Sequence, residues 1–178
     1  RVCISFVSAC FAGTDVSDKN AQLLQAAKDG NLQAVQTAIS EGAIPNVKDV
    51  NGVPVLVWTA NNGYTDIVKL LLDKGADVNV KDTDGTNALW QAAWKGHAEV
   101  VKLLMEKGAD INVKKTIDGE TALRQAAWKG HVEVVKLLLE KGADVNETTD
   151  GVTALMTASQ ADHAEVVKLL LEKGADVN

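Results

Sequence analysis

Two stretches of the chain, DGTNALWQAAWKGHAEVVKLLMEKGADIN (residues 84–112) and DGETALRQAAWKGHVEVVKLLLEKGADVN (residues 118–146), are close copies of each other. The spacing of these copies is found along most of the chain. One series of glycines has gaps of 33, 33, 34 and 32 residues: Gly42, Gly75, Gly108, Gly142 and Gly174. A fixed period of this length is the mark of a protein built from stacked structural repeats.

The second copy shows what one unit folds into. Leu123, Ala126 and Ala127 lie at helical spacing, and Thr121 before them is suited to cap the first turn with its hydroxyl. Gly130 is expected to end this helix in the left-handed conformation. Apolar residues at 134, 135 and 137–139 then predict a second amphipathic helix, and Gly142 with the following GADVN predicts a turn.

Each unit is thus a pair of helices followed by an extended loop. Two short helices cannot bury their apolar sides alone, so stacked units are expected to share one continuous core. We divide the chain into a leader (1–17) and five units: 18–48, 49–81, 82–115, 116–148 and 149–178.

The amino-acid composition limits the classes of function that the chain can have. Aromatic residues make up only 4% of the chain, so the core has to be built from Ala, Val, Leu and Ile. The net charge of -6 opposes nucleic-acid binding, which needs clustered Lys and Arg. No apolar run reaches the roughly 18 residues that a membrane-spanning helix requires. Both cysteines, Cys3 and Cys10, lie in the first ten residues, so the repeats contain no disulfide and no thiolate metal site.

The first twelve residues, RVCISFVSACFA, differ from the rest of the chain. One Arg, an apolar stretch and small residues resemble the end of a secretory signal peptide, which predicts export to a periplasm or a membrane surface. The run VSAC (7–10) resembles the lipobox of bacterial lipoproteins, and this resemblance implies acylation of Cys10. The alternative is a partly packed leader on a cytoplasmic protein.

The period and the run GHVEVVKLLLEKGADVN (130–146) resemble the ankyrin repeat over residues 18–178. The resemblance implies an all-α solenoid of about five helix–turn–helix units, joined by finger loops that resemble β-hairpins. It also implies a scaffold that binds a protein through its fingers and concave face, without enzymatic activity or cofactor.

The chain departs from this family at the start of the first helix of each unit. The family's Thr-Pro-Leu-His reads PVLV (54–57), NALW (87–90), TALR (121–124) and TALM (153–156) here. The family's Pro and His are therefore absent, and we expect softer helix starts and doubtful cross-links between adjacent loops. Asp162 replaces the glycine between the two helices of the last unit, which predicts a small loss of stability.

The two ends of the repeat array differ. The first unit is rich in Gln, which is typical of a polar N-terminal cap. The last unit ends at Asn178 without such a cap, so we expect the natural protein to continue. An alternative function follows from this expectation: a targeting or regulatory module of a larger enzyme or secreted effector.

Trp94 and Trp128 are the leading candidates for partner contact, because they occupy equivalent places and each is followed by Lys (Lys95 and Lys129). Ankyrin-like proteins commonly use this place, together with the fingers, to bind partners, and exposed indoles favour tight contacts. The candidate finger residues are Thr83, Asp84, Thr86, Ile117, Asp118 and Glu120. The alternative is that both indoles pack on neighbouring helices. Trp58 and Trp90 are expected to be partly buried.

A catalytic or metal site is not predicted. His97, His131 and His163 occupy the same place in successive units, about 10 Å apart, so they cannot share an ion; we expect local hydrogen bonds from each. The aspartates of the GAD turns (Asp77, Asp110, Asp144 and Asp176) are expected to accept bonds from nearby backbone amides. The partner is predicted to be a protein, bound by a monomeric chain.

The leader gives the first testable prediction. Incubation of expressing bacteria with a palmitate analogue should label the chain, and Cys10→Ser should remove the label, because Cys10 is the residue that the lipobox acylates. Equal labelling of both proteins would contradict this role of Cys10.

Overall fold

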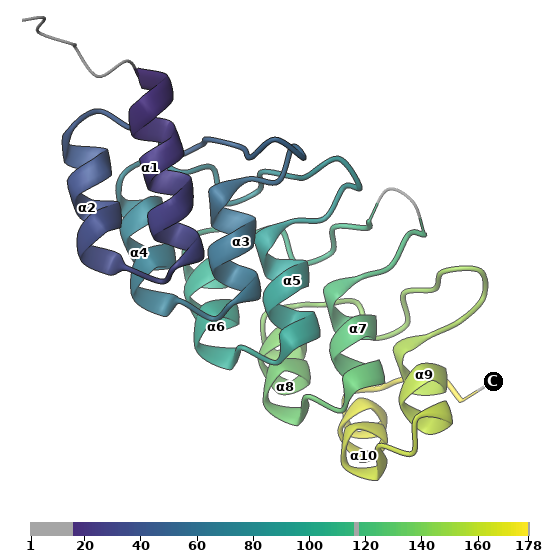
Figure 1. Ribbon diagram of the computed structural model, residues 1–178. Coiled ribbons are helices and arrows are strands. Elements are labelled where there is room, and N and C mark those ends of the chain that lie inside the picture. Colours follow the sequence, from purple (N-terminus) through teal and green to yellow (C-terminus); the bar gives the residue numbers. More distant parts are fainter. Residues whose placement is uncertain (1–15, 116–117, 178) are drawn as a thin grey trace, which may run out of the picture.

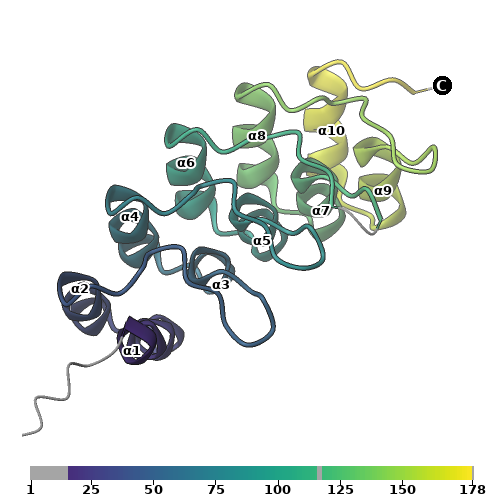
Figure 2. The same cartoon turned by 90° about the horizontal axis from the view of Figure 1, so that it is seen from above.

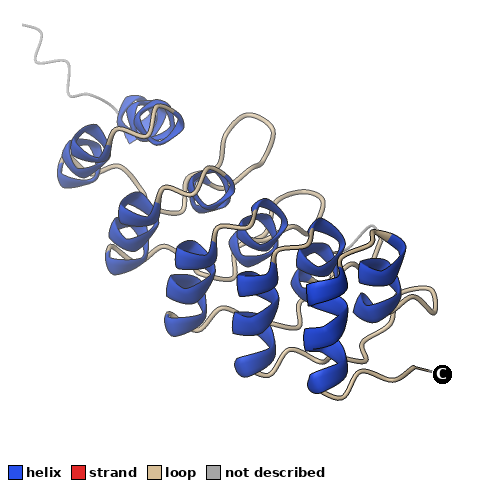
Figure 3. Ribbon diagram, turned by 90° about the horizontal axis from the view of Figure 1, so that it is seen from below, coloured by secondary structure: helices blue, strands red, loops and turns tan. Residues whose placement is uncertain are grey.

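The computed structural model describes residues 16–115 and 118–177, and these residues form ten α-helices arranged as five pairs (Figures 1 and 3). The helices are α1 (Val16–Lys28), α2 (Leu32–Ser40), α3 (Val55–Asn61), α4 (Thr65–Asp73), α5 (Ala88–Lys95), α6 (Ala98–Glu106), α7 (Ala122–Lys129), α8 (Val132–Glu140), α9 (Ala154–Gln160) and α10 (Ala164–Glu172). In the described ranges the only β-type pairing consists of isolated bridges in the loops. The predicted all-α class is confirmed.

The pairs stack into a solenoid with two rows of helices. The odd-numbered helices stand side by side in one row and the even-numbered helices in the other (Figures 1 and 2). Within the rows, α3 packs on α5, α5 on α7, and α7 on α9, while α4, α6, α8 and α10 follow each other in the same way. The first helix begins at Val16, two residues before the expected boundary at residue 18; the rest of the expected leader, including Cys10, lies outside the described residues.

Burial shows that each unit is covered by the next one. Val68, Val101 and Val135 occupy the same place in α4, α6 and α8, and all three are 0% exposed. Val167, the equivalent residue of α10, is partly exposed, because no further unit covers it in the described structure. Pairs of small residues, such as Ala126 and Ala127, are fully buried and let the odd-numbered helices approach closely.

Side-chain caps begin α5, α7 and α9, whereas α3 follows Pro54 and has no side-chain cap. Asn87 Oδ1 accepts a hydrogen bond from the amide of Trp90 at 2.8 Å. Thr121 Oγ1 accepts one from the amide of Arg124 at 3.3 Å, as predicted, and Thr153 caps α9 in the same way. Gly130 ends α7 in the left-handed conformation with φ of 72°, which is also as predicted. These caps satisfy amides that the first turn leaves without partners.

The prediction of local hydrogen bonds for the three histidines was wrong, because each bond reaches the preceding unit. His97, His131 and His163 each lie just before an even-numbered helix, and Nε2 donates to the carbonyl of Asn61, Trp94 or Trp128 at 2.9–3.0 Å. The imidazole of His131 also lies so close to Gly96 that an added Cβ there would come within 2.7 Å of it.

Asp162 adopts the left-handed conformation of the glycines that it replaces, with φ of 59°. At Gly96 and Gly130 the imidazole of the next unit's histidine leaves no room for a Cβ, whereas no later unit in the described residues places a histidine against Asp162. Aspartate also tolerates this conformation better than most residues. Both reasons explain why the substitution is accepted at the last unit.

A ladder of asparagines ties adjacent loops together without the family's histidine. Asn79 Oδ1 accepts from the amide of Asp110 at 2.8 Å, and its Nδ2 donates to the carbonyl of Gly108 at 3.4 Å. Asn46, Asn112 and Asn146 make the same two bonds with the following unit. The aspartates of the turns act as predicted, since Asp77, Asp110 and Asp144 each accept a bond from the amide two residues later.

The loops between units form four fingers: finger 1 (48–54), finger 2 (81–87), finger 3 (115–120, with 116–117 not described) and finger 4 (149–152). An aspartate organises each of the first two. Asp49 Oδ1 accepts from the amides of Asn51 and Val53, and Asp82 Oδ1 accepts from those of Asp84 and Thr86. The fingers therefore hold a defined shape beside the odd-numbered helices.

The asparagine ladder yields a prediction for stability. Asn79→Ala removes two bonds between units 2 and 3 and should lower the free energy of unfolding by about 1 kcal/mol, the net value of an exposed hydrogen-bonded side chain. Urea denaturation measures the change. Asn51→Ala is the matched control, because the exposed side chain of Asn51 makes no hydrogen bond in the described structure. Equal stability of both variants would contradict the role of the ladder.

The carboxylate of Asp49 makes stability depend on pH. Burial by itself raises the pKa of Asp49, whose side chain is 4% exposed, but donors from Val53, Trp58 and Asn51 and the charge of Lys28 outweigh burial and hold the pKa below its usual value. The unfolded chain therefore takes up this proton first as the pH falls. The stabilisation is present above the unfolded pKa of about 3.9 and is lost as the pH falls through the lower folded value.

We expect Asp49→Asn to be less stable than the parent at pH 7, and the difference between them to shrink below about pH 3. Chemical denaturation at several pH values measures both. Asp84→Asn, which changes an exposed carboxylate that accepts no hydrogen bond in the described residues, is the control. A difference that stays constant over this pH range would refute the assignment.

Candidate functional site

The structure places Trp94 and Trp128 at the ends of α5 and α7, on the side of the solenoid beside the fingers. Trp128 is 49% exposed, whereas Trp94 is partly buried. The two indoles therefore differ in exposure, and contact of either with a partner stays a prediction. The ammonium of Lys129 lies 4.3 Å from the ring centre of Trp128 and 5.7 Å from that of Trp94, and Lys95 lies 5.1 Å from Trp94.

Trp90 belongs to the same aromatic cluster, although the sequence pattern pointed only to Trp94 and Trp128. The ring centre of Trp90 lies 5.4 Å from that of Trp94, and Trp90 is only 7% exposed, more deeply buried than expected. Residues four apart share one face of a helix, so the spacing of Trp90 and Trp94 was the signal that could have revealed the pair. The ammonium of Lys115 lies 5.2 Å from the ring of Trp90.

A hollow of about 360 Å³ lies between the tryptophans and fingers 2 and 3. Its lining is Asp82, Asp84, Thr86, Trp90, Gln91, Trp94, Lys115, Glu120, Gln125 and Trp128. The fold thus brings together five predicted contact residues from two units: Asp84, Thr86, Trp94, Glu120 and Trp128.

The remaining predicted residues lie outside this hollow or offer little surface. Thr83 is exposed on finger 2, Asp118 is exposed on finger 3, and Ile117 lies outside the described residues. Thr86 is 3% exposed, so it contributes to the wall of the hollow more than to an open surface.

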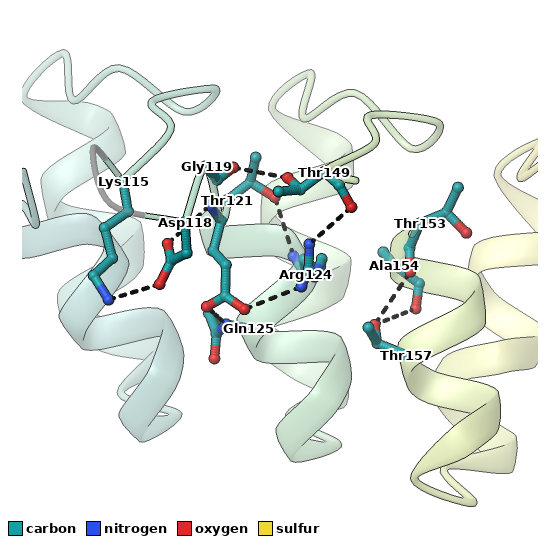
Figure 4. A network of polar contacts seen from close by, with 11 residues as sticks. Lys115, Asp118, Gly119, Thr121, Arg124, Gln125, Thr149, Thr153, Ala154 and Thr157 are labelled. Carbon is teal, nitrogen blue, oxygen red and sulfur yellow. Dashed lines mark hydrogen bonds and ion pairs between the residues drawn. The ribbon is translucent and has the colours of Figure 1, made fainter. Parts of the chain in front are cut away.

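The described residues of finger 3 make ionic and hydrogen-bonded contacts with each other, with α7 and with finger 4 (Figure 4). Lys115 Nζ donates to Asp118 Oδ2 at 2.9 Å, and Arg124 pairs with Glu120 at 3.1 Å. Gln125 Nε2 also donates to Glu120, and Thr149 Oγ1 of finger 4 donates to the carbonyl of Gly119 at 2.8 Å. These contacts hold the described residues of finger 3 that line one wall of the hollow.

The two charges of the Lys115–Asp118 pair shift each other's titration. The hydrogen bond to Asp118 raises the pKa of Lys115, although burial opposes this change. Burial alone raises the pKa of Asp118, but the bond from Lys115 and the amide of Glu120 bring it below its ordinary value. Both groups thus stay charged near neutral pH, and the carboxylate of Asp118 is already occupied.

The described residues contain no group of three or more His, Cys, Asp or Glu side chains that could hold a metal ion. Within the same ranges, none of the helices has both the length and the apolar character needed to span a bilayer. What the hollow offers is aromatic surface beside carboxylates, which is suited to noncovalent recognition.

Comparison with known families agrees with this architecture. The family model for ankyrin repeats in three copies matches residues 23–115 and 112–178, which together cover most of the chain. A comparison with curated proteins finds no match. The stacked helix pairs, the fingers and the family model lead to one conclusion: the chain belongs to the ankyrin repeat family.

Proposed function

We propose that this chain captures a protein partner in the hollow between Trp94, Trp128 and fingers 2 and 3. Ankyrin repeats are protein–protein interaction modules, and the family generally serves as a scaffold without enzymatic activity. The observation that carries this proposal is the exposed indole of Trp128 beside a hollow formed by two units.

The energetics favour burial of this indole by a partner. A tryptophan buries about 150–250 Å² when covered, and the exposed half is worth about 2–3 kcal/mol at about 25 cal/mol per Å². The contact between Lys129 and the ring, if a partner displaces it, costs about 0.5–1 kcal/mol at an exposed site. Burial of the ring therefore outweighs the loss of the cation–π contact.

The scaffold adds affinity by being ordered in advance. The hollow is walled by helices whose small residues are fully buried, and by finger 3, which Arg124 and Thr149 hold in place. A binding surface that is already rigid loses less conformational entropy when it binds.

Substitution of the tryptophans tests this proposal. Trp128→Ala should reduce capture of binding proteins from an extract of the source cells at least tenfold, because about 1.4 kcal/mol corresponds to tenfold in affinity. Trp94→Ala combined with Trp128→Ala should abolish capture while helicity by circular dichroism persists. The single variant is the cleaner probe, since Trp94 also packs on Trp90.

Leu171→Ala is the matched control. Leu171 is 44% exposed, close to the value for Trp128, but lies on α10 in the other row of helices. Capture that survives Trp128→Ala and is lost with Leu171→Ala would place the binding surface elsewhere and refute the proposal. Loss of helicity in Trp128→Ala would show that this indole belongs to the core.

A further inference from the structure

Fingers 1 and 2 carry equivalent carboxylates, Asp49 and Asp82, which lie 33 residues apart. In both, Oδ1 accepts two backbone amides of its own finger. At Asp49 the second oxygen is also used: the indole N–H of Trp58 donates to Oδ2 at 3.1 Å, and Lys28 Nζ lies 3.8 Å away. The Lys28 ammonium also lies 5.3 Å from the centre of the Trp58 ring.

The second oxygen of Asp82 lacks these partners. One repeat after Trp58 and Lys28, the chain carries Gln91 and Asn61. Neither side chain donates to Asp82, and no described lysine or arginine lies within ion-pair distance of it. The place that a lysine and an indole N–H fill at Asp49 is thus left without a donor at Asp82.

A hollow of about 190 Å³ occupies this place, between α3 and α5. Its lining is Val53, Val57, Trp58, Asn61, Asp82 and Gln91. Gln91 Oε1 is buried and has no hydrogen-bond partner among the described residues. The hollow therefore combines a carboxylate oxygen without a donor, an orphan carbonyl oxygen and an aromatic wall.

We propose that this hollow, the Asp82 pocket, binds an arginine side chain of the protein partner. Arginine offers five N–H donors and no acceptor, so it can serve Asp82 Oδ2 and, after a small side-chain adjustment, Gln91 Oε1. The planar guanidinium also stacks on an aromatic ring such as that of Trp58 better than a compact ammonium does. The chain itself shows that a cationic side chain fits beside this carboxylate, because Lys28 occupies the equivalent place at Asp49 one repeat earlier.

The position of the Asp82 pocket also determines which repeat of the solenoid binds the arginine. Lys115 and Thr149 occupy the corresponding place at the base of fingers 3 and 4, so no carboxylate is offered there. Asp82 and Gln91 also line the hollow beside Trp94 and Trp128. A partner that buries Trp128 therefore has the Asp82 pocket next to it. This inference rests on the proposed function. It adds that the partner must carry a positive charge at the place that meets Asp82.

The test uses a small probe and needs no partner. The ¹⁵N-labelled chain is titrated with N-acetyl-arginine methylamide, and the amides of Asp84 and Thr86, the indole N–H of Trp58 and the side-chain amide of Gln91 are followed by NMR. All four signals should shift together with one dissociation constant. N-acetyl-citrulline methylamide, a neutral probe of nearly the same shape, should bind at least about threefold more weakly.

Variants separate the pocket from its surroundings. Asp82→Asn retains an oxygen for the amides of Asp84 and Thr86, and should weaken the arginine probe about three- to tenfold. Asp84→Asn, a neighbouring exposed carboxylate, should change the constant less than about twofold. Asn61→Lys should place an ammonium where Lys28 places one at Asp49, and should abolish the response while the rest of the spectrum stays unchanged.

The proposal is overturned if arginine and citrulline probes bind equally, if Asp82→Asn binds the arginine probe as the parent does, or if the parent gives no response. Lysine in place of arginine with equal affinity would overturn the preference for a guanidinium. Trp128→Ala should leave the arginine response unchanged, so failure of the Asp82 pocket and failure of capture at Trp128 give different results.

Discussion

The fold depends on the burial of one helix pair by the next. A helix of seven to nine residues is too short to be stable alone, and every pair from α3 to α10 is built from such helices. Stacking removes the apolar side of each pair from water, as the complete burial of Val68, Val101 and Val135 shows. The histidine bonds reinforce this contact, because each joins an even-numbered helix to the odd-numbered helix of the preceding unit.

Stacking leaves one series of positions free to vary. The place two residues before the turn between the helices of a unit (Gly30, Gly63, Gly96, Gly130 and Asp162) is held by Lys28, Asn61, Trp94, Trp128 and Gln160 in successive units. These side chains differ in charge, size and polarity, whereas the two places before them hold small residues in every unit. The scaffold therefore does not constrain this series, and recognition of a partner can depend on it.

The sequence predicted most of the architecture because the repeat period can be counted directly along the chain, and because helix caps and turn glycines act within their own turn. Thr121 and Gly130 act as expected, since a cap bonds within its own turn and a left-handed residue depends on its own backbone. The histidines were misinterpreted for the opposite reason: the acceptor of His131 is the carbonyl of Trp94, 37 residues earlier. Contacts between side chains also explain why Trp94 is less exposed than Trp128: Trp90 and Lys129 lie against its ring.

The repeated pattern alone thus determined the helices, their pairing and the side of the solenoid that carries the fingers, because these follow from short-range propensity and from apolar faces that must be buried. Only the tertiary structure decided how similar residues differ in their surroundings. Asp49 and Asp82 have the same place in the pattern, yet one carboxylate is paired and the other has an oxygen without a donor. The physical reason is that their donors come from neighbouring helices, so the state of each carboxylate depends on which side chain crosses the gap between units.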